Sequence, residues 1–452
     1  MTAAAAVPER RETAAAPSFG EAFRVWLRIG VLSFGGPAGQ IALMHRMLVD
    51  ERRWIGEAPF LHALNYCMLL PGPEAQQLAT YVGWRLHGLA GGLVAGTLFV
   101  LPGAALMLLL AALYEQFHAL GAVAALFLGI KAAVLAIVAE AVHRIGKRVL
   151  RNRAMLAVAA GAFVAIFVFD LPFPLIVLGA AAIGFAGARL APGQFAVIKG
   201  HAVAAGAPAA PAVGRRRQAI AVLAVGLPLW FAPIGLAALL LGQASVLVDI
   251  GLFFSKLAVV TFGGAYAVLA YMAQQAVENY GWLAPGEMLD GLGLAETTPG
   301  PLILVTEFVG YLGAFRQHAP FEAATAGVLG AAMTLWVTFV PCFVWIFLGA
   351  PYVERLSGNR HLAAALSCIT AAVVGVVLNL ALWFGLHVLF AEVEVLEAAG
   401  AHLLLPVPAS LQVVPAALAA LAALLLLHFR LGVAATLGLS GALGLAWGLA
   451  FG

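Results

Sequence analysis

Charged residues are scarce in this sequence of 452 residues. Lys, Arg, Asp and Glu make up only 10% of it, whereas 63% of the residues are apolar. Soluble domains carry about 25% charged residues and about 45–50% apolar ones. A soluble fold is therefore excluded, because it could not bury this much apolar surface.

The sequence also lacks the alternation of apolar and polar residues that an outer-membrane β-barrel needs. Its apolar runs are instead continuous over about 20 or more residues, as in 90–114 and 406–427. Helices satisfy their own backbone hydrogen bonds in lipid. The sequence therefore predicts an all-α polytopic membrane protein.

Cysteines and clustered metal ligands are few. Cys67, Cys342 and Cys368 all lie in apolar runs, so they form neither a disulfide framework nor a metal site. The 11 histidines are scattered without an HExxH motif, and no GxxxxGK[ST] loop occurs. These absences argue against a metalloenzyme, a redox enzyme and an ATP-driven pump. We expect no enzyme activity, no cofactor and no metal.

An excess of charge of one sign is also missing. The 24 Lys and Arg residues against 21 Asp and Glu residues give a net charge of +3, which does not indicate nucleic-acid binding. Residues 1–17 lack the apolar core of a signal peptide followed by a cleavage site. They are predicted to be a short disordered cytoplasmic tail.

Long apolar stretches predict thirteen membrane spans. Basic clusters at 144–153 and 189–217 are separated by two of them, and the positive-inside rule places both in the cytoplasm. Counting outward gives a cytoplasmic N-terminus and a periplasmic C-terminus. Arg52 and Arg53 then fall outside, against the rule, so the side of the 50–57 loop stays open. The predicted spans are 22–49, 58–88, 90–114, 120–142, 154–169, 173–190, 218–240, 245–277, 286–315, 321–349, 361–389, 406–428 and 432–450.

An Ala/Pro/Arg-rich cytoplasmic linker at 191–217 divides the chain. It separates an N-terminal transporter repeat at 18–190 from an extra linking helix at 218–240, which is followed by a C-terminal repeat at 241–452.

The two halves repeat one another. LSFGGP at 32–37 matches VTFGGA at 260–265, and LLPGP at 69–73 matches TTPGP at 297–301, each with a separation of 228 residues. Trp54 meets Trp282 at the same separation, and the register slips by one after PGP. With thirteen spans the second copy enters from the opposite side. This predicts inverted-topology repeats, as in many secondary transporters.

The FGG and PGP motifs lie inside long apolar stretches and predict helices that stop and restart. Proline removes a helical hydrogen bond, and Gly-Gly adds conformational freedom. A restarted half-helix points free N–H groups and a positive dipole end into the membrane, which suits an anion. A simple proline kink is the alternative for each motif. The substrate-binding candidates at these breaks are Ser33, Phe34, Gly35, Gly36, Pro37, Pro71, Gly72, Pro73, Gln77, Thr261, Phe262, Gly263, Gly264, Thr298, Pro299, Gly300 and Pro301.

Two cations and three acids lie near the breaks. Arg28 and Lys256 each precede FGG by six residues, and a charge at that depth is costly without a partner or a cavity. We expect Lys256, with Arg28, to face the anion; snorkelling to the interface is the alternative. The proton-coupling candidates are Glu74, Glu296 and Glu307, and for Glu74 capping of a helix N-terminus is the alternative.

These motifs together closely resemble the chromate ion transporter family, and in particular its long two-domain bacterial members, over residues 20–450. The resemblance implies efflux of chromate across the inner membrane and chromate resistance, with sulfate as a close chemical analogue. The residues alone indicate a secondary transporter with a dipole-lined anion site in the lipid bilayer. Transport of sulfate or another tetrahedral oxyanion, an anion channel and a membrane sensor remain alternatives. A coupling proton and a homodimer also remain open.

Overall fold

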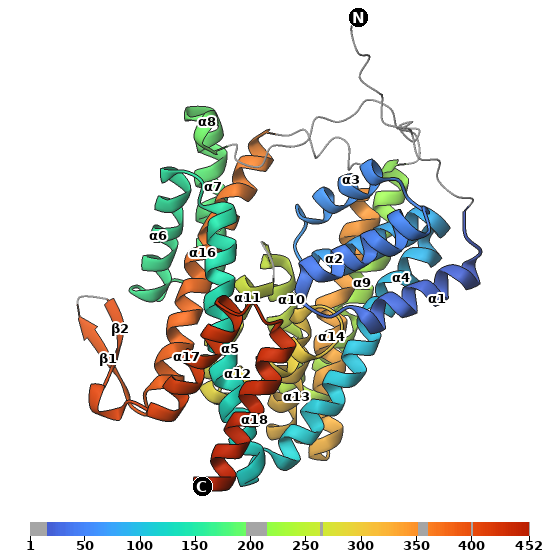
Figure 1. Cartoon of the computed structure of the whole chain (residues 1–452). Helices are drawn as coiled ribbons and strands as arrows, with labels where there is room; N and C mark the ends of the chain where they lie inside the picture. Colours follow the sequence, from blue (N-terminus) through green and yellow to red (C-terminus); the bar gives the residue numbers. More distant parts are fainter. Residues whose placement is uncertain (1–15, 196–214, 263–264, 351–359, 399–400, 452) are drawn as a thin grey trace, which may run out of the picture.

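A computed structural model of the chain describes residues 16–195, 215–262, 265–350, 360–398 and 401–451. The predicted all-α polytopic architecture is confirmed, since helices account for nearly all of the described residues (Figure 1). Seven of these helices are long and apolar enough to cross a membrane. Residues 1–15, Gly263, Gly264 and most of the predicted linker lie outside the described residues.

The first half contains the following elements, where η1 is a π-helix: α1 (Phe19–Leu32), α2 (Gly36–His45), η1 (Arg46–Glu51), α3 (Glu57–Cys67), α4 (Glu74–Phe117), α5 (Gly121–Val149), α6 (Arg153–Phe167), α7 (Phe173–Leu190) and α8 (Pro192–Phe195).

The second half contains the following elements, where η3 is a π-helix and η4 and η6 are 3₁₀-helices: α9 (Arg215–Leu241), α10 (Val246–Val260), α11 (Ala265–Gln274), η3 (Gln275–Asn279), α12 (Pro285–Thr297), η4 (Leu302–Leu304), α13 (Val305–Arg316), α14 (Ala323–Gly349), α16 (Arg360–Leu389), β1 (Val393–Ala398), β2 (Ala401–Pro406), η6 (Pro408–Ser410), α17 (Val413–Leu427) and α18 (Val433–Phe451).

The molecule has two ends that serve as reference points. We call one the linker end, because α7 finishes and α9 begins there; Asn152 before α6 also lies there, donating to the carbonyl of Gln194 at 2.6 Å. The other is the β-hairpin end, where β1 and β2 pair antiparallel and the N–H of His402 donates to the carbonyl of Val168. Part of the segment between the predicted spans 361–389 and 406–428 is thus a short hairpin.

The broken helices of the first half turn back instead of crossing. Glu21 near the start of α1 pairs with Arg52 after η1 at 3.1 Å, although a continuous helix would separate them by about 45 Å. The ring of Phe19 also packs against His87, with centroids 5.4 Å apart. Helices α1 and α2, and likewise α3 and the first part of α4, therefore form re-entrant helix pairs that enter from the linker end.

A tight turn divides α4 into two antiparallel segments, 74–86 and 89–117. His87 and Gly88 leave the helical conformation, and Gly88 has a φ of 61°. Beyond the turn, Gly92 packs against the carbonyl of Thr80, where an added Cβ would lie 3.1 Å from that oxygen. The second segment runs to the β-hairpin end, where α5 begins.

The second half repeats this arrangement from the opposite end. Arg316 at the end of α13 forms a bidentate pair with Glu287 at the start of α12, with both distances 2.8 Å, and also contacts Glu115 near the end of α4. Phe253 of α10 packs against Tyr280 after η3, with centroids 5.6 Å apart. Two helix pairs, α10 with α11 and α12 with α13, therefore re-enter from the β-hairpin end. The repeats are thus inverted relative to one another.

Four of the predicted spans, 22–49, 58–88, 245–277 and 286–315, are therefore wrong as crossings. The thirteen-span count is not reproduced: besides the seven long helices, α6 and α17 are shorter apolar helices of 15 residues each. The physical reason is that Gly35 and Gly36 adopt φ of 86° and 72°, which reverses the chain where a helix was expected to stop and restart within one crossing. Two predicted crossings are removed from each repeat. An even number of removed crossings does not change the side on which the second repeat begins, so the repeats remain inverted.

The reversal also moves the basic residues of the first loop. Arg46, Arg52 and Arg53 follow α2, whose far end returns to the linker end. They now lie on the same side as the basic cluster at 144–153. The exception to the positive-inside rule is removed.

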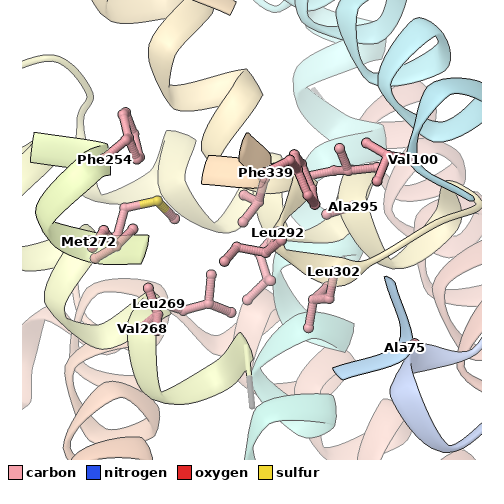
Figure 2. Close-up of a cluster of buried hydrophobic side chains, with 14 of the residues drawn as sticks. Ala75, Val100, Phe254, Val268, Leu269, Met272, Leu292, Ala295, Leu302 and Phe339 are labelled. Carbon is pink, nitrogen blue, oxygen red and sulfur yellow. The ribbon is translucent and has the colours of Figure 1, made fainter. Parts of the chain in front are cut away.

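The helices fall into two groups that meet around α11 and α12 (Figure 1). In the first group, which we call the bundle group, α5, α6 and α7 pack against α16, α17 and α18. In the second group, which contains re-entrant helices, α1, α4, α9, α10, α13 and α14 pack together. Figure 2 shows buried apolar side chains gathered where they meet, with Leu269 of α11 facing Leu292 of α12.

Candidate functional site

The breaks of the two repeats meet at the centre and are joined by two hydrogen bonds. The N–H of Gly72 donates to the carbonyl of Thr261 at 2.8 Å, and the N–H of Gly300 donates to the carbonyl of Ser33 at 2.8 Å. A shift of 228 residues converts either bond into the other. Each FGG break is therefore tied to the PGP break of the other repeat.

Equivalent side-chain hydrogen bonds and glycine conformations in both repeats position the backbone groups that make these bonds. The hydroxyl of Ser33 donates to the carbonyl of Ile29, and that of Thr261 donates to Leu257, both at 2.6 Å. These bonds satisfy carbonyls at the ends of α1 and α10, where the chain leaves the helix. Gly72 has a φ of 118° and Gly300 one of 89°, a region that only glycine adopts readily.

A small cavity of about 10 Å³ lies between the four breaks, and the helices that restart there begin along its wall. Glu74 and Ala75 are the first residues of α4, and Leu302 and Ile303 are the first of η4, which leads into α13. The rest of the lining comes from Pro37 of α2, Ala265 of α11, and Gln40, Pro73, Thr261 and Pro301.

The helix starts around the cavity favour an anion, whereas the carboxylate of Glu74 in the same wall opposes one. The first N–H groups of a helix have no acceptor within it, and each N-terminus carries about half a positive charge. Four such ends together approach the charge of a divalent anion. Pro37 contributes no N–H, so α2 contributes mainly its dipole. The volume is about that of one water, so the surrounding helices must separate before a larger anion can enter.

Two glutamines of the first repeat donate hydrogen bonds to backbone carbonyls of the PGP breaks. The amide of Gln40 donates to the carbonyl of Gly300 at 2.6 Å and approaches that of Ser33 at 3.4 Å. The amide of Gln77 donates to the carbonyl of Pro71 at 2.7 Å. Gln40 was not among the residues predicted from the sequence, although a polar residue three positions after Pro37 in an apolar stretch was a signal.

Four other predicted residues of the breaks lie outside the cavity wall. Thr298 is buried and its hydroxyl donates to Ala295, so it caps its own helix. The side chain of Phe34 is 49% exposed and Phe262 is half-buried; neither lines the cavity. The carbonyl of Pro299 packs against Gly103 of α4.

The two predicted cations do not line the cavity. Arg28 and Lys256 are both exposed, and the ammonium of Lys256 lies 5.5 Å from the ring centroid of Tyr271. Lys256 precedes Thr261 by five residues, which is about 140° around a helix. It therefore projects from a different face of α10 than the residue that reaches the cavity, and Arg28 stands in the same relation to Ser33.

The three predicted acids have different surroundings. Glu74 lines the cavity. Glu296 accepts a hydrogen bond from the hydroxyl of Tyr266 at 2.5 Å. Glu307 in α13 is only 1% exposed, and neither of its carboxyl oxygens has a partner among the described residues.

The one-residue slip after PGP has a structural cause. The second repeat restarts as the 3₁₀-helix η4 over Leu302–Leu304, whereas the first restarts directly as α4. Three residues of 3₁₀-helix rise about 6 Å, as much as four residues of α-helix. The second repeat therefore reaches the same depth with one residue fewer, and Glu307 occupies the place of Thr80.

Comparison with known proteins gives a consistent result. A family model described as chromate transporter matches residues 20–185 and 248–445, and leaves the linker and α9 between the matched ranges. The chain is 36% identical to a chromate transport protein of Pseudomonas aeruginosa over 80% of this chain and 79% of that protein. It is 29% identical to a chromate transport protein of Cupriavidus metallidurans over 78% and 79%.

A probable chromate transport protein of Synechococcus elongatus is 28% identical over 78% of this chain and 81% of its own length. No solved structure gives a significant match.

Proposed function

Because the chain belongs to the chromate transporter family, we propose that it is a secondary active transporter that exports chromate across the inner membrane and so gives chromate resistance. The observation that carries this proposal is the cavity between the four breaks, whose wall is formed by the starts of the restarted helices. Such ends favour an anion without any cationic side chain.

Chromate would bind where the N–H groups of Glu74, Ala75, Leu302 and Ile303 begin their helices. The dipoles of α2 and α11 complete the proposed site. Gln40 and Gln77 hold the break backbones in place through their bonds to carbonyls. In this conformation the cavity is too small to hold the anion, so binding requires another state of the transport cycle.

We assign the linker end to the cytoplasm. It carries the basic clusters and, with them, Arg52 and Arg53, so the positive-inside rule favours this orientation. The β-hairpin end then faces the periplasm. Reporter fusions in the 52–56 segment and after Arg316 test this assignment: opposite sides are expected, and the same side for both would contradict it.

A proton is the coupling ion in this proposal. Burying an ionised carboxylate without a partner is costly, so Glu307 is assigned the neutral, proton-carrying form in this conformation. Glu74 stands where the anion would bind, so its negative charge and the anion exclude each other. Glu296 is held by Tyr266 and is the weakest of the three candidates.

Transport of sulfate or another tetrahedral oxyanion is the alternative substrate, and an anion channel or a sensor is the alternative class. Purified protein in proteoliposomes separates them by chromate and sulfate flux under an imposed pH gradient. We expect saturable chromate flux that the gradient accelerates and that chromate on the other side stimulates. Flux without such counterflow would identify a channel, and no flux would refute transport.

A further inference from the structure

A second cavity, of about 260 Å³, lies at the β-hairpin end between α4, α5 and the start of α12. Asp290 of α12 lines it and is only 2% exposed. Its Oδ2 accepts a hydrogen bond from the hydroxyl of Tyr114 at 2.8 Å and pairs with the ammonium of Lys131 at 3.2 Å. Its Oδ1 is buried and has no hydrogen-bond partner among the described residues.

We propose that Asp290, paired with Lys131, is the site at which the protein takes up its driving proton from the β-hairpin end. This inference rests on the proposed function and adds to it the entry point of the coupling ion. Uptake converts the Asp290 carboxylate and one proton from water into a carboxylic acid, and it ends the ion pair with Lys131.

The chemistry of the cluster favours a proton over a metal cation or an anion. The ammonium of Lys131 already occupies the cation position beside Asp290, so a metal ion would bring two positive charges together. An anion would meet the carboxylates of Asp290 and Glu287 in the same cavity. A proton needs no further space and can bond at the free Oδ1.

Breaking the ion pair costs less for Lys131 than for an ionised Asp290. The side chain of Lys131 is 29% exposed and lies at the cavity, whereas that of Asp290 is 3% exposed. Water in the cavity can therefore solvate a lone ammonium, but a lone carboxylate would be left buried. The pair is thus poised to open by protonation of Asp290.

Opening the pair would loosen the contact between α12 and the bundle group. Lys131 lies on α5 of the bundle group, and Asp290 lies on α12, whose other end is the break at 298–301. Seven residues of helix, about 10 Å, separate Asp290 from that break. A proton at the β-hairpin end is thereby connected to the backbone that lines the central cavity.

The other charged groups near Asp290 are engaged with one another. Glu287 on α12 is held by Arg316 of α13, which also pairs with Glu115 of α4. His118 of α4 lines the same cavity, and its ring bonds the carbonyl of Tyr114. Helix α18 contains no titratable residue, and α16 has only His387 at this end, bonded to the carbonyl of Trp383.

The test separates proton coupling from substrate exchange in proteoliposomes. Asp290→Asn should retain chromate–chromate exchange within about twofold of wild type and lose about tenfold or more of pH-gradient-driven accumulation. The double variant Asp290→Asn with Lys131→Met leaves no unpaired buried charge, so it keeps the fold and shows the same loss. Glu397→Gln, which removes an exposed carboxylate at the same end, is the matched control and should behave as wild type.

Gradient-driven accumulation at the wild-type level in both Asp290 variants would overturn the proposal. Loss of exchange together with accumulation in the double variant would also overturn it, because the pair would then be structural. Failure of the proposed function itself is distinguishable, since wild-type protein would then show no chromate exchange.

Discussion

The two repeats are alike in their backbone and unlike in their chemistry. Ser33 and Thr261 make equivalent bonds at the FGG breaks, and Gly72 and Gly300 make equivalent bonds at the PGP breaks. The polar side chains around them differ. At equivalent positions the first repeat has one residue and the second repeat another: His62 and Asp290, Gln40 and Val268, Glu74 and Leu302, and Thr80 and Glu307.

This contrast separates two requirements of alternating access. An inverted pair of repeats with the same backbone can exchange roles, so that the inward-facing and outward-facing states resemble one another. Acids present in only one repeat make those two states unequal in energy and in their affinity for protons. We infer that the shared hydrogen bonds provide the moving scaffold, and that the unshared acids provide direction and coupling.

The largest effect is expected from breaking the shared backbone. Gly72→Val and Gly300→Val each force a branched side chain into a positive φ, a strain of about 1–3 kcal/mol, and at Gly72 the new Cβ would lie 2.8 Å from the sulfur of Cys342. We expect chromate transport in vesicles to fall to background in both variants, with protein still present in the membrane by immunoblot.

Gly161→Val on the exposed face of α6 is the control, because nothing lies within 4 Å of its added Cβ. Normal transport by Gly300→Val alone would show that the two hydrogen bonds are not equivalent.

The next effect concerns an acid without a counterpart. Glu307→Leu removes a buried carboxyl that lacks partners, so we expect the free energy of unfolding to rise by roughly 1–3 kcal/mol while stimulation by a pH gradient is lost. Thermal unfolding followed by fluorescence, together with flux at two imposed gradients, measures both.

Glu307→Gln serves as the comparison variant, since it keeps the shape but cannot carry a proton. It should lose the stimulation without the gain in stability. Full stimulation in both variants would exclude Glu307 as a proton carrier.

A smaller effect is expected at the cavity wall. Glu74→Gln removes a negative charge from the cavity wall, where its counterpart Leu302 has none. Because the carboxylate and chromate repel each other by about 1 kcal/mol, the apparent KM for chromate should fall about fivefold. The difference from wild type should shrink as the pH falls, because protonated Glu74 is also neutral.

Glu57→Gln, at the first residue of α3 and away from the break, controls for loss of an acid at a helix start. A higher KM in Glu74→Gln would mean that Glu74 assists binding.

The smallest effect is expected from the two exposed cations. Lys256→Gln and Arg28→Gln should change the apparent KM for chromate by less than about twofold, because neither side chain lines the cavity. Initial-rate measurements over a range of chromate concentrations are sufficient. A rise of about tenfold for Lys256→Gln, reduced in Lys256→Arg, would place this lysine on the path of the anion.

The sequence was sufficient for the fold class, the repeat and the position of every break. It was not sufficient for the reversal of the chain there, because hydropathy depends only on the length and composition of a stretch. The contact that decides the reversal, Glu21 with Arg52, joins residues 31 positions apart. The misplaced Arg52 and Arg53 were a usable signal, since only a returning helix pair brings them to the basic side.

The site was predictable to the extent that it follows from the repeat. The motif residues come together because the same separation relates both breaks. Helical periodicity alone would have shown that Lys256 and Thr261 lie on different faces of α10. The pairing of Lys131 with Asp290 could not be anticipated, because it joins two helices that are neighbours only in the folded chain.

Helix α9 has a consequence that reaches beyond packing. In each repeat the re-entrant pairs return to their own end, and four helical segments run between the ends, so a repeat finishes on the side where it started. A second copy joined directly would lie parallel to the first. The single passage of α9, a peripheral helix with only 17% of its apolar window buried, is what inverts the second copy. Two separate one-repeat chains without such a helix could build the same centre only by inserting into the membrane in opposite orientations.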